Sequence, residues 1–210
     1  MTTFLVEDKD YSLSEIYHYL HDRPKLILSE EIQSQINASR KVLDDAVLED
    51  KVIYGVNTGF GKLSQVKIPN DKISDLQRNL ILSHAVGVGE PIPDDITILI
   101  ILLKIISLSK GYSGIRLLVV QRLVDMLNNN CLPIIPCQGS VGASGDLAPL
   151  SHMTLPLLGV GDVKFNGNVI SAETALQKLG WSPIQLSYKE GLALINGTQF
   201  STAYGVFCME

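Results

Sequence analysis

The segment from Ile96 to Ile106 (ITILIILLKII) constrains the fold more strongly than the rest of this chain. A helix formed by it is apolar on nearly every side, so other elements have to surround it. The segment is too short to cross a bilayer, and Lys104 interrupts it. Pro93 and the two aspartates after it supply a start, and Gly111 supplies a stop. We therefore predict a buried helix over residues 93–109, with the rest of the chain packed around it.

Hydrophobic spacing predicts that the surrounding chain is mainly α-helical, with a few short strands. The predicted helices begin at capping residues and carry one apolar face, and they cover residues 13–20, 29–46, 71–85, 114–129, 146–158 and 171–179, with a last helix from 189 onward. Residues 52–67 are predicted to form a short strand or an extended loop. Two prolines predict a break over 131–136. Asn166-Gly167 predicts a type I′ turn in a hairpin over 159–170.

Composition excludes several classes of protein. A length of 210 residues suits one large domain or two small ones. The net charge of -5, without a basic cluster, argues against a nucleic-acid partner. Three cysteines without a C-x-x-C pair or a metal-ligand spacing argue against a disulfide framework and a metal site. The N-terminus lacks the pattern of a secretory signal, and we expect a cytoplasmic protein with no membrane partner. The 19% charged and 46% hydrophobic residues favour burial in an oligomer, with one large core as the alternative.

A glycine-rich stretch over residues 139–149 (GSVGASGDLAP) is the most informative motif for chemistry. It is not a phosphate-binding loop, because Asp146 follows Gly145 where that loop needs a lysine. It also fails the dinucleotide fingerprint and misses the nucleophile-elbow pattern by one residue. An ordinary glycine-serine loop remains an alternative.

The tripeptide Ala143-Ser144-Gly145 within this stretch can in principle close on itself. The amide nitrogen of Gly145 would attack the carbonyl carbon of Ala143, and loss of water from Ser144 would leave an exocyclic methylene. Gly145 has no Cβ, which allows the close approach and the strained turn. The product would be a strong electrophile, which none of the standard side chains provides.

The stretch GSVGASGDLAPLSHM over residues 139–153 resembles the prosthetic-group segment of the histidine and aromatic amino acid ammonia-lyases. Three further segments resemble that family in the expected order: residues 54–61 (YGVNTGFG), 79–90 (NLILSHAVGVGE) and 189–199 (KEGLALINGTQ). The resemblance covers most of the chain from Tyr54 onward. It implies that Ala143, Ser144 and Gly145 become 4-methylidene-imidazol-5-one (MIO), and Asp146 is expected to assist the cyclisation.

The resemblance also implies a fold and an assembly. The expected fold is mainly α, the helical N-terminal MIO domain of the aromatic amino acid lyase (L-aspartase-like) type with a few short strands. Residues 1–210 would be the N-terminal domain of a longer lyase, with the C-terminal helical domain absent. The longer family proteins form homotetramers, so a homo-oligomer is expected.

The resemblance assigns roles to five further residues. Tyr54 would be the base that removes the β-proton of an amino acid substrate, and its phenol would need a lowered pKa for that task. Ser83 and His84 would contact the substrate side chain, since a Ser-His pair at this place goes with histidine. Asn196 and Gln199 would lie against the MIO ring and the substrate amine. The alternatives are a buried tyrosine, a core histidine and amides bonded within a helix.

Two hypotheses follow. The first is an enzyme that eliminates ammonia from L-histidine to give urocanate, the first step of histidine degradation, with tyrosine or phenylalanine ammonia-lyases and aminomutases as alternatives. The second is a truncated chain with little activity alone, since groups that complete the site in the family come from the C-terminal half and from neighbouring subunits. In that case the ring could be uncyclised.

Overall fold

Helices make up most of the chain, as the sequence predicted. The computed structural model describes residues 2–49, 52–59, 61–63, 66–142 and 145–209. The α-helices are α1 (Leu13–Asp22), α2 (Glu30–Leu48), α3 (Ile73–His84), α4 (Asp94–Ser109), α5 (Leu117–Asn128), α6 (Leu147–Thr154), α7 (Ala172–Leu179), α8 (Glu190–Ile195) and α9 (Gln199–Cys208). Short 3-10 helices are η1 (Gly61–Leu63), η2 (Asn70–Lys72) and η3 (Leu155–Leu158).

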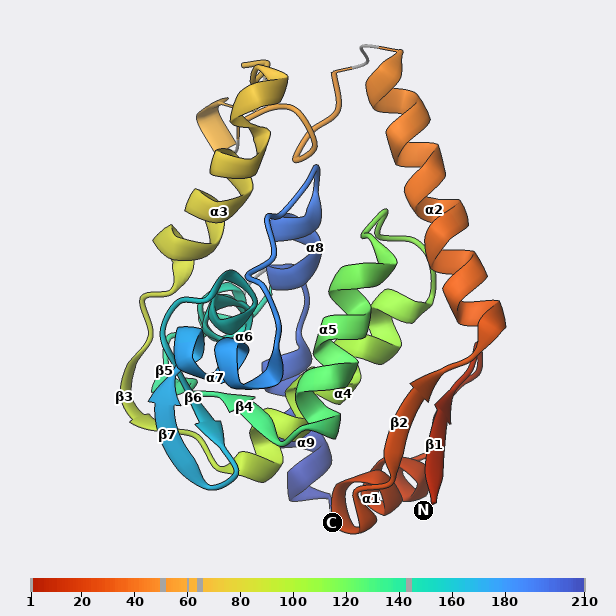
Figure 1. Cartoon of the computed structure of the whole chain (residues 1–210), viewed down its shortest axis with the longest axis vertical. Coiled ribbons are helices and arrows are strands. Elements are labelled where there is room, and N and C mark those ends of the chain that lie inside the picture. Colours follow the sequence, from red (N-terminus) through yellow and green to blue (C-terminus); the bar gives the residue numbers. More distant parts are fainter. Residues whose placement is uncertain (1, 50–51, 60, 64–65, 143–144, 210) are drawn as a thin grey trace.

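Seven short strands form three small sheets in the described part of the chain. Their bounds are β1 (Thr3–Val6), β2 (Lys25–Leu28), β3 (Val88–Pro91), β4 (Cys131–Pro133), β5 (Pro136–Gln138), β6 (Asp162–Phe165) and β7 (Asn168–Ser171). Strands β1 and β2 are parallel, β3 and β5 are antiparallel, and β4, β6 and β7 form an antiparallel sheet in that order. These sheets lie around the helices and not at the centre of the molecule (Figure 1).

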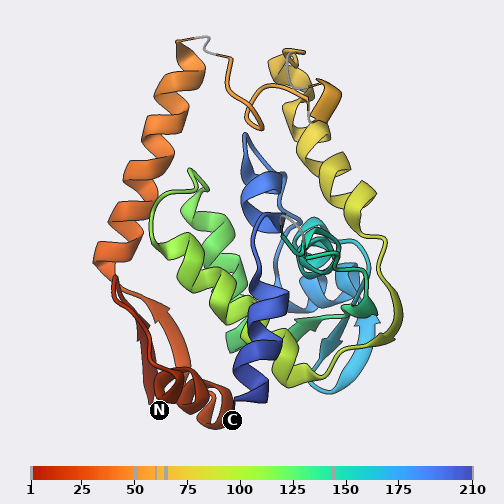
Figure 2. The ribbon, with the colours of Figure 1, turned by 180° about the vertical axis from the view of Figure 1, so that it is seen from behind.

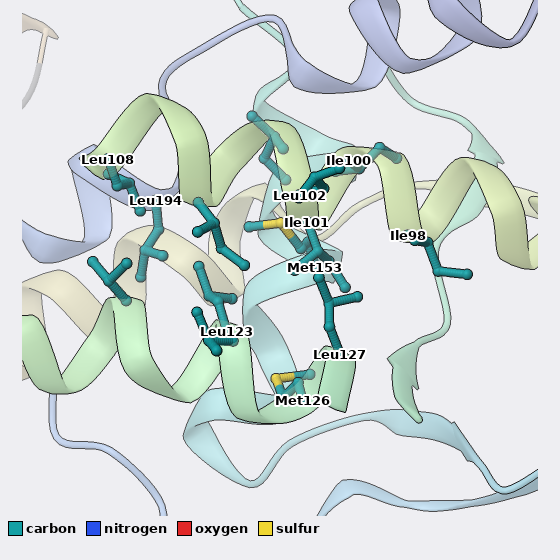
Figure 3. Close-up of a cluster of buried hydrophobic side chains, with 14 of the residues drawn as sticks. Ile98, Ile100, Ile101, Leu102, Leu108, Leu123, Met126, Leu127, Met153 and Leu194 are labelled. Carbon is teal, nitrogen blue, oxygen red and sulfur yellow. The ribbon is translucent and has the colours of Figure 1, made fainter. Parts of the chain in front are cut away.

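Helix α4 is the centre of the core, as its composition predicted. It packs against α1, α2, α5, α9 and β4. Its side chains from Ile98 to Leu102 are at most 1% exposed. Figure 3 shows α4 and α5 facing each other, with Met153 of α6 and Leu194 of α8 packed into the same cluster. Within the described residues, no helix is long and apolar enough to cross a membrane.

Local sequence signals set several element ends. Ser12 caps α1 in a capping box with Glu15, and Ser29 caps α2 by accepting the amide of Ile32. The predicted hairpin is confirmed as β6 and β7, where Asn166 and Gly167 both have positive φ angles, as a type I′ turn requires.

Two predictions about elements were wrong. The single helix predicted from residue 189 is two helices, α8 and α9, separated at residues 196–198. Gly197 has a φ of 150°, which breaks the helix at this point. Residues 131–136, predicted only as a break, contribute β4 and the first residue of β5.

The strands β1 and β2 were not predicted. They form a parallel pair connected by α1. Asn128, at the end of α5, donates to the carbonyl of Leu26 at 2.9 Å and accepts the Leu26 amide at 2.8 Å. This tertiary contact, which involves a residue 102 positions away, holds the edge of β2.

Candidate functional site

The turn between α8 and α9 packs directly against Gly145. A Cβ placed on Gly145 would lie 3.0 Å from the carbonyl oxygen of Gly197 and 3.2 Å from its nitrogen. Gly145 also has a φ of 145°, a backbone conformation that favours glycine. The fold therefore brings the backbone of Gly197 close to Gly145. Its neighbours Ala143 and Ser144, the other two residues of the predicted ring, lie outside the described residues.

Asp146 joins the end of this tripeptide to the start of α9. Its amide donates to the carbonyl of Gly197 at 2.7 Å. Its fully buried carboxylate accepts the hydroxyl of Ser140 at 2.5 Å, the hydroxyl of Ser201 at 2.7 Å and the amide of Ser201 at 2.9 Å. Ser201 is in the first turn of α9, so the carboxylate provides the N-terminal cap that Thr198 does not.

Asn196 and Gln199, predicted to face the ring, both lie on the turn that contacts Gly145. The side-chain oxygen of Asn196 is 3.6 Å from the Cβ position of Gly145. The amide group of Gln199 lies over Gly197, where a Cβ would collide with it. Its Oε1 atom is buried and, among the described residues, accepts no hydrogen bond. The amide of Asn196 thus lies near Gly145, and the unsatisfied acceptor of Gln199 lies against Gly197.

Ser83 and His84 occupy the last turn of α3. Both side chains contact the carbonyl of Leu80, with the hydroxyl of Ser83 donating at 3.1 Å and Nδ1 of His84 at 2.8 Å. Because a carbonyl can only accept, Nδ1 carries the hydrogen, and the neutral ring then has Nε2 as an acceptor. His84 is half-buried and so is neither the core histidine of the alternative nor a surface residue.

Contacts after His84 bring this segment to the loop before Gly145. Gly87 donates its amide to Nε2 of His152 in α6 at 3.0 Å. A Cβ on Gly139 would lie 3.0 Å from the Cα of Gly87. Burial lowers the pKa of His152, which favours the neutral form that the acceptor role requires. His152 therefore joins two of the predicted site segments.

Tyr54 lies in the turn formed by residues 54–57, between α2 and α3, and its side chain is 56% exposed. The buried tyrosine of the alternative interpretation is thus not found. In Figures 1 and 2, the segment that carries this turn connects the ends of α2 and α3 that lie far from the chain termini. The placement of Tyr54 against a substrate stays a prediction.

Two buried charged residues, one bonded to the end of α8 and one at its start, were not identified as site residues from the sequence. Lys104 is 1% exposed, and its ammonium donates to the carbonyls of Ala193 at 3.1 Å and Asn196 at 3.2 Å. Glu190, the first residue of α8, is fully buried and pairs with Arg116, whose Nε and Nη2 lie 2.6 and 2.7 Å from its carboxylate oxygens. The sequence did contain a signal for both, because each is a charged residue within an apolar segment.

A further buried polar contact fixes α8 against α3. Gln77 is fully buried, and its Oε1 accepts the amide of Gly191 at 2.8 Å. A Cβ on Gly191 would lie 3.0 Å from the carbonyl oxygen of Gln77, so the two helices approach closely. This contact fixes α3, which ends at His84, against α8, which Asn196 caps. Among the described residues, no cluster of three or more metal-ligating side chains is found.

The order and packing of these segments agree with a known family. Residues 11–210 match the family described as aromatic amino acid lyase. The chain belongs to the aromatic amino acid lyase family. This lyase chain is 46% identical, over its whole length, to a histidine ammonia-lyase of Idiomarina loihiensis, and it covers 42% of that relative.

Solved structures of the family confirm the fold of the lyase chain. Histidine ammonia-lyase from Trypanosoma cruzi matches with a TM-score of 0.89 and 38% identity, over 99% of this chain and 40% of that one. A phenylalanine aminomutase from Pantoea agglomerans matches with a TM-score of 0.90 and 36% identity, again over 99% and 40%. The lyase chain thus spans about two fifths of the length of these relatives.

Proposed function

We propose that this chain is the MIO-bearing part of a histidine ammonia-lyase, which eliminates ammonia from L-histidine to give urocanate. The observation that carries the proposal is the packing of Gly145 against the turn at Asn196 and Gly197, with Asp146 bonded to the same turn. Family membership makes an MIO-type reaction the expected chemistry. The longer protein would supply the remaining groups of the site, as a homo-oligomer.

The residues around Gly145 fit the proposed ring. Glycine suits position 145, because a Cβ there would lie 3.0 Å from the carbonyl oxygen of Gly197 and the φ of 145° disfavours other residues. The side-chain amides of Asn196 and Gln199 suit a ring that takes up electron density, because their N–H donors stabilise a developing negative charge on the ring oxygen. The buried Oε1 of Gln199 can also accept a hydrogen bond from the ammonium group of the substrate. When formed, the ring supplies an electrophile that draws electrons from the substrate.

The other residues would bind and orient the substrate and move its proton. His84 presents Nε2 as an acceptor for the N–H of a neutral imidazole, because its Nδ1 hydrogen is engaged by Leu80. Tyr54 would remove the β-proton, which is too weakly acidic to leave without withdrawal of electrons elsewhere in the substrate. In this assignment Ser83 and His84 select the substrate, and Tyr54 and the ring perform the elimination.

The intact mass of the purified chain tests the central step. Ring closure releases one water and dehydration of Ser144 releases a second, so a cyclised chain is lighter than its sequence by two waters. We expect the wild-type chain to show this loss and Ser144→Ala to lack the loss from dehydration. A wild-type mass equal to that of the sequence would contradict ring formation in this chain.

The substrate assignment predicts a change in selectivity. In the longer protein, Ser83→His together with His84→Leu should shift relative kcat/KM from histidine toward tyrosine by about tenfold or more, because a group that hydrogen-bonds imidazole is lost. Initial rates with L-histidine, L-tyrosine and L-phenylalanine measure the shift. His18→Leu, at an exposed position on α1, is the matched control and should leave the ratio unchanged. An unchanged ratio in the double variant would favour a tyrosine or phenylalanine lyase or an aminomutase on this scaffold.

A further inference from the structure

Lys104 is a buried charged residue in an apolar part of helix α4. Its neighbours on α4 are isoleucines and leucines, and its own side chain is 1% exposed. Burial lowers the pKa of Lys104 to about 7, so the ammonium is costly at this position. A methionine would fill a similar volume without that cost. A role beyond packing would account for a lysine at this position.

The two acceptors of Lys104 lie at the end of α8. Ala193 is in the last turn of that helix, and Asn196 is the residue that caps it. Carbonyls at this end of a helix lack partners within the helix and carry a partial negative charge, which a cation offsets. The lysine therefore ties the end of α8 to the central helix α4.

The residue after this anchored end is Gly197, which contacts Gly145 and accepts the amide of Asp146. We propose that Lys104 is a positioning residue, which holds the turn of Asn196 and Gly197 against Gly145 in the geometry needed for ring formation. The part of this proposal that concerns the ring rests on the proposed function. The part that concerns the turn rests on the hydrogen bonds of Lys104 alone.

Hydrogen exchange at the Asp146 amide tests the turn, because that amide donates to Gly197. We would compare the purified wild-type chain with Lys104→Met, which keeps the apolar volume, and with Lys104→Arg, which keeps the charge. Lys110→Met is the matched control, because Lys110 caps the same helix and its side chain bonds to Asp8 and Lys9 of the N-terminal segment.

In Lys104→Met, we expect the Asp146 amide to exchange at least about tenfold faster than in wild type, because a charged donor to two carbonyls is lost. Amides in α5 should keep wild-type protection. Loss of two waters should be slower or incomplete in this variant. Lys104→Arg should restore part of the protection of the Asp146 amide and part of the water loss. Lys110→Met should match wild type in both measurements.

A folded Lys104→Met chain with wild-type exchange at Asp146 and complete loss of two waters would overturn the proposal. If Lys104→Met does not fold, Lys104→Gln, which is shorter and uncharged but still polar, replaces it, and wild-type behaviour of that variant has the same meaning. If the wild-type chain itself shows no loss of water, the proposed function fails for this chain. The exchange rate at Asp146 then still decides whether Lys104 holds the turn.

Discussion

Glu190→Ala should lower the free energy of unfolding by about 3 kcal/mol, because it leaves the partly buried guanidinium of Arg116 and two backbone donors without their partner. The carboxylate is fully buried and accepts Nε and Nη2 of Arg116. It also accepts the backbone amides of Arg116 and Ser187, at 3.1 and 2.7 Å. Arg116 keeps 33% of its side chain exposed, so water compensates part of the loss. Urea unfolding of the purified chain measures the change.

A matched control distinguishes the contribution of this ion pair to stability from that of any acidic residue at the start of a helix. Glu173 is exposed in the first turn of α7, and Glu173→Ala should change the free energy of unfolding by at most about 0.5 kcal/mol. Equal effects of the two substitutions would refute the structural role of the buried pair. Glu190 is the first residue of α8, the helix that Asn196 caps at its other end.

Tyr54→Phe in the longer protein should lower kcat/KM for ammonia release by about a factor of 10² to 10⁴, the range expected for loss of a general base. The phenyl ring keeps the shape of the side chain and removes only the hydroxyl that would take the β-proton. The loss of two waters should not change, because Tyr54 lies outside the segment that cyclises. Steady-state rates and intact mass of the same sample measure the two properties.

Tyr112→Phe is the control for this substitution, because Tyr112 is 87% exposed. It should leave kcat/KM unchanged. A Tyr54→Phe variant that retains activity within about twofold of wild type would assign the base to another residue. A variant that also loses the two-water change would instead indicate that Tyr54 acts on folding of the site.

Much of the helical framework follows from local sequence signals. The apolar run around Ile101 requires a central helix, and serine caps and the Asn166-Gly167 turn mark element ends that the structure confirms. These signals are local, so a single sequence reveals them. The parallel pairing of β1 with β2 was not predictable in this way, because the two four-residue strands are separated in the sequence by α1 and β2 also bonds to Asn128 of a distant helix.

The candidate site was likewise predicted only in part from the sequence. The segments that contain Gly145, His84 and Asn196 were identified from the sequence, because each resembles a segment of the ammonia-lyase family. The division between α8 and α9 was missed, although the polar residues 196–199 (NGTQ) contain an Asn-Gly pair, which is typical of a turn. The role of Lys104 was missed because its partners are backbone carbonyls, which carry no sequence signal.

The hydrogen bonds of Asp146 have a consequence for the timing of synthesis. Its carboxylate is satisfied by Ser201, which lies 55 positions further along the chain. While the chain emerges from a ribosome, the residue after the tripeptide cannot reach its final position until α9 has been made and docked. Any ring closure that needs this geometry would therefore be a late event, and the mass of arrested shorter chains would record when α9 arrives.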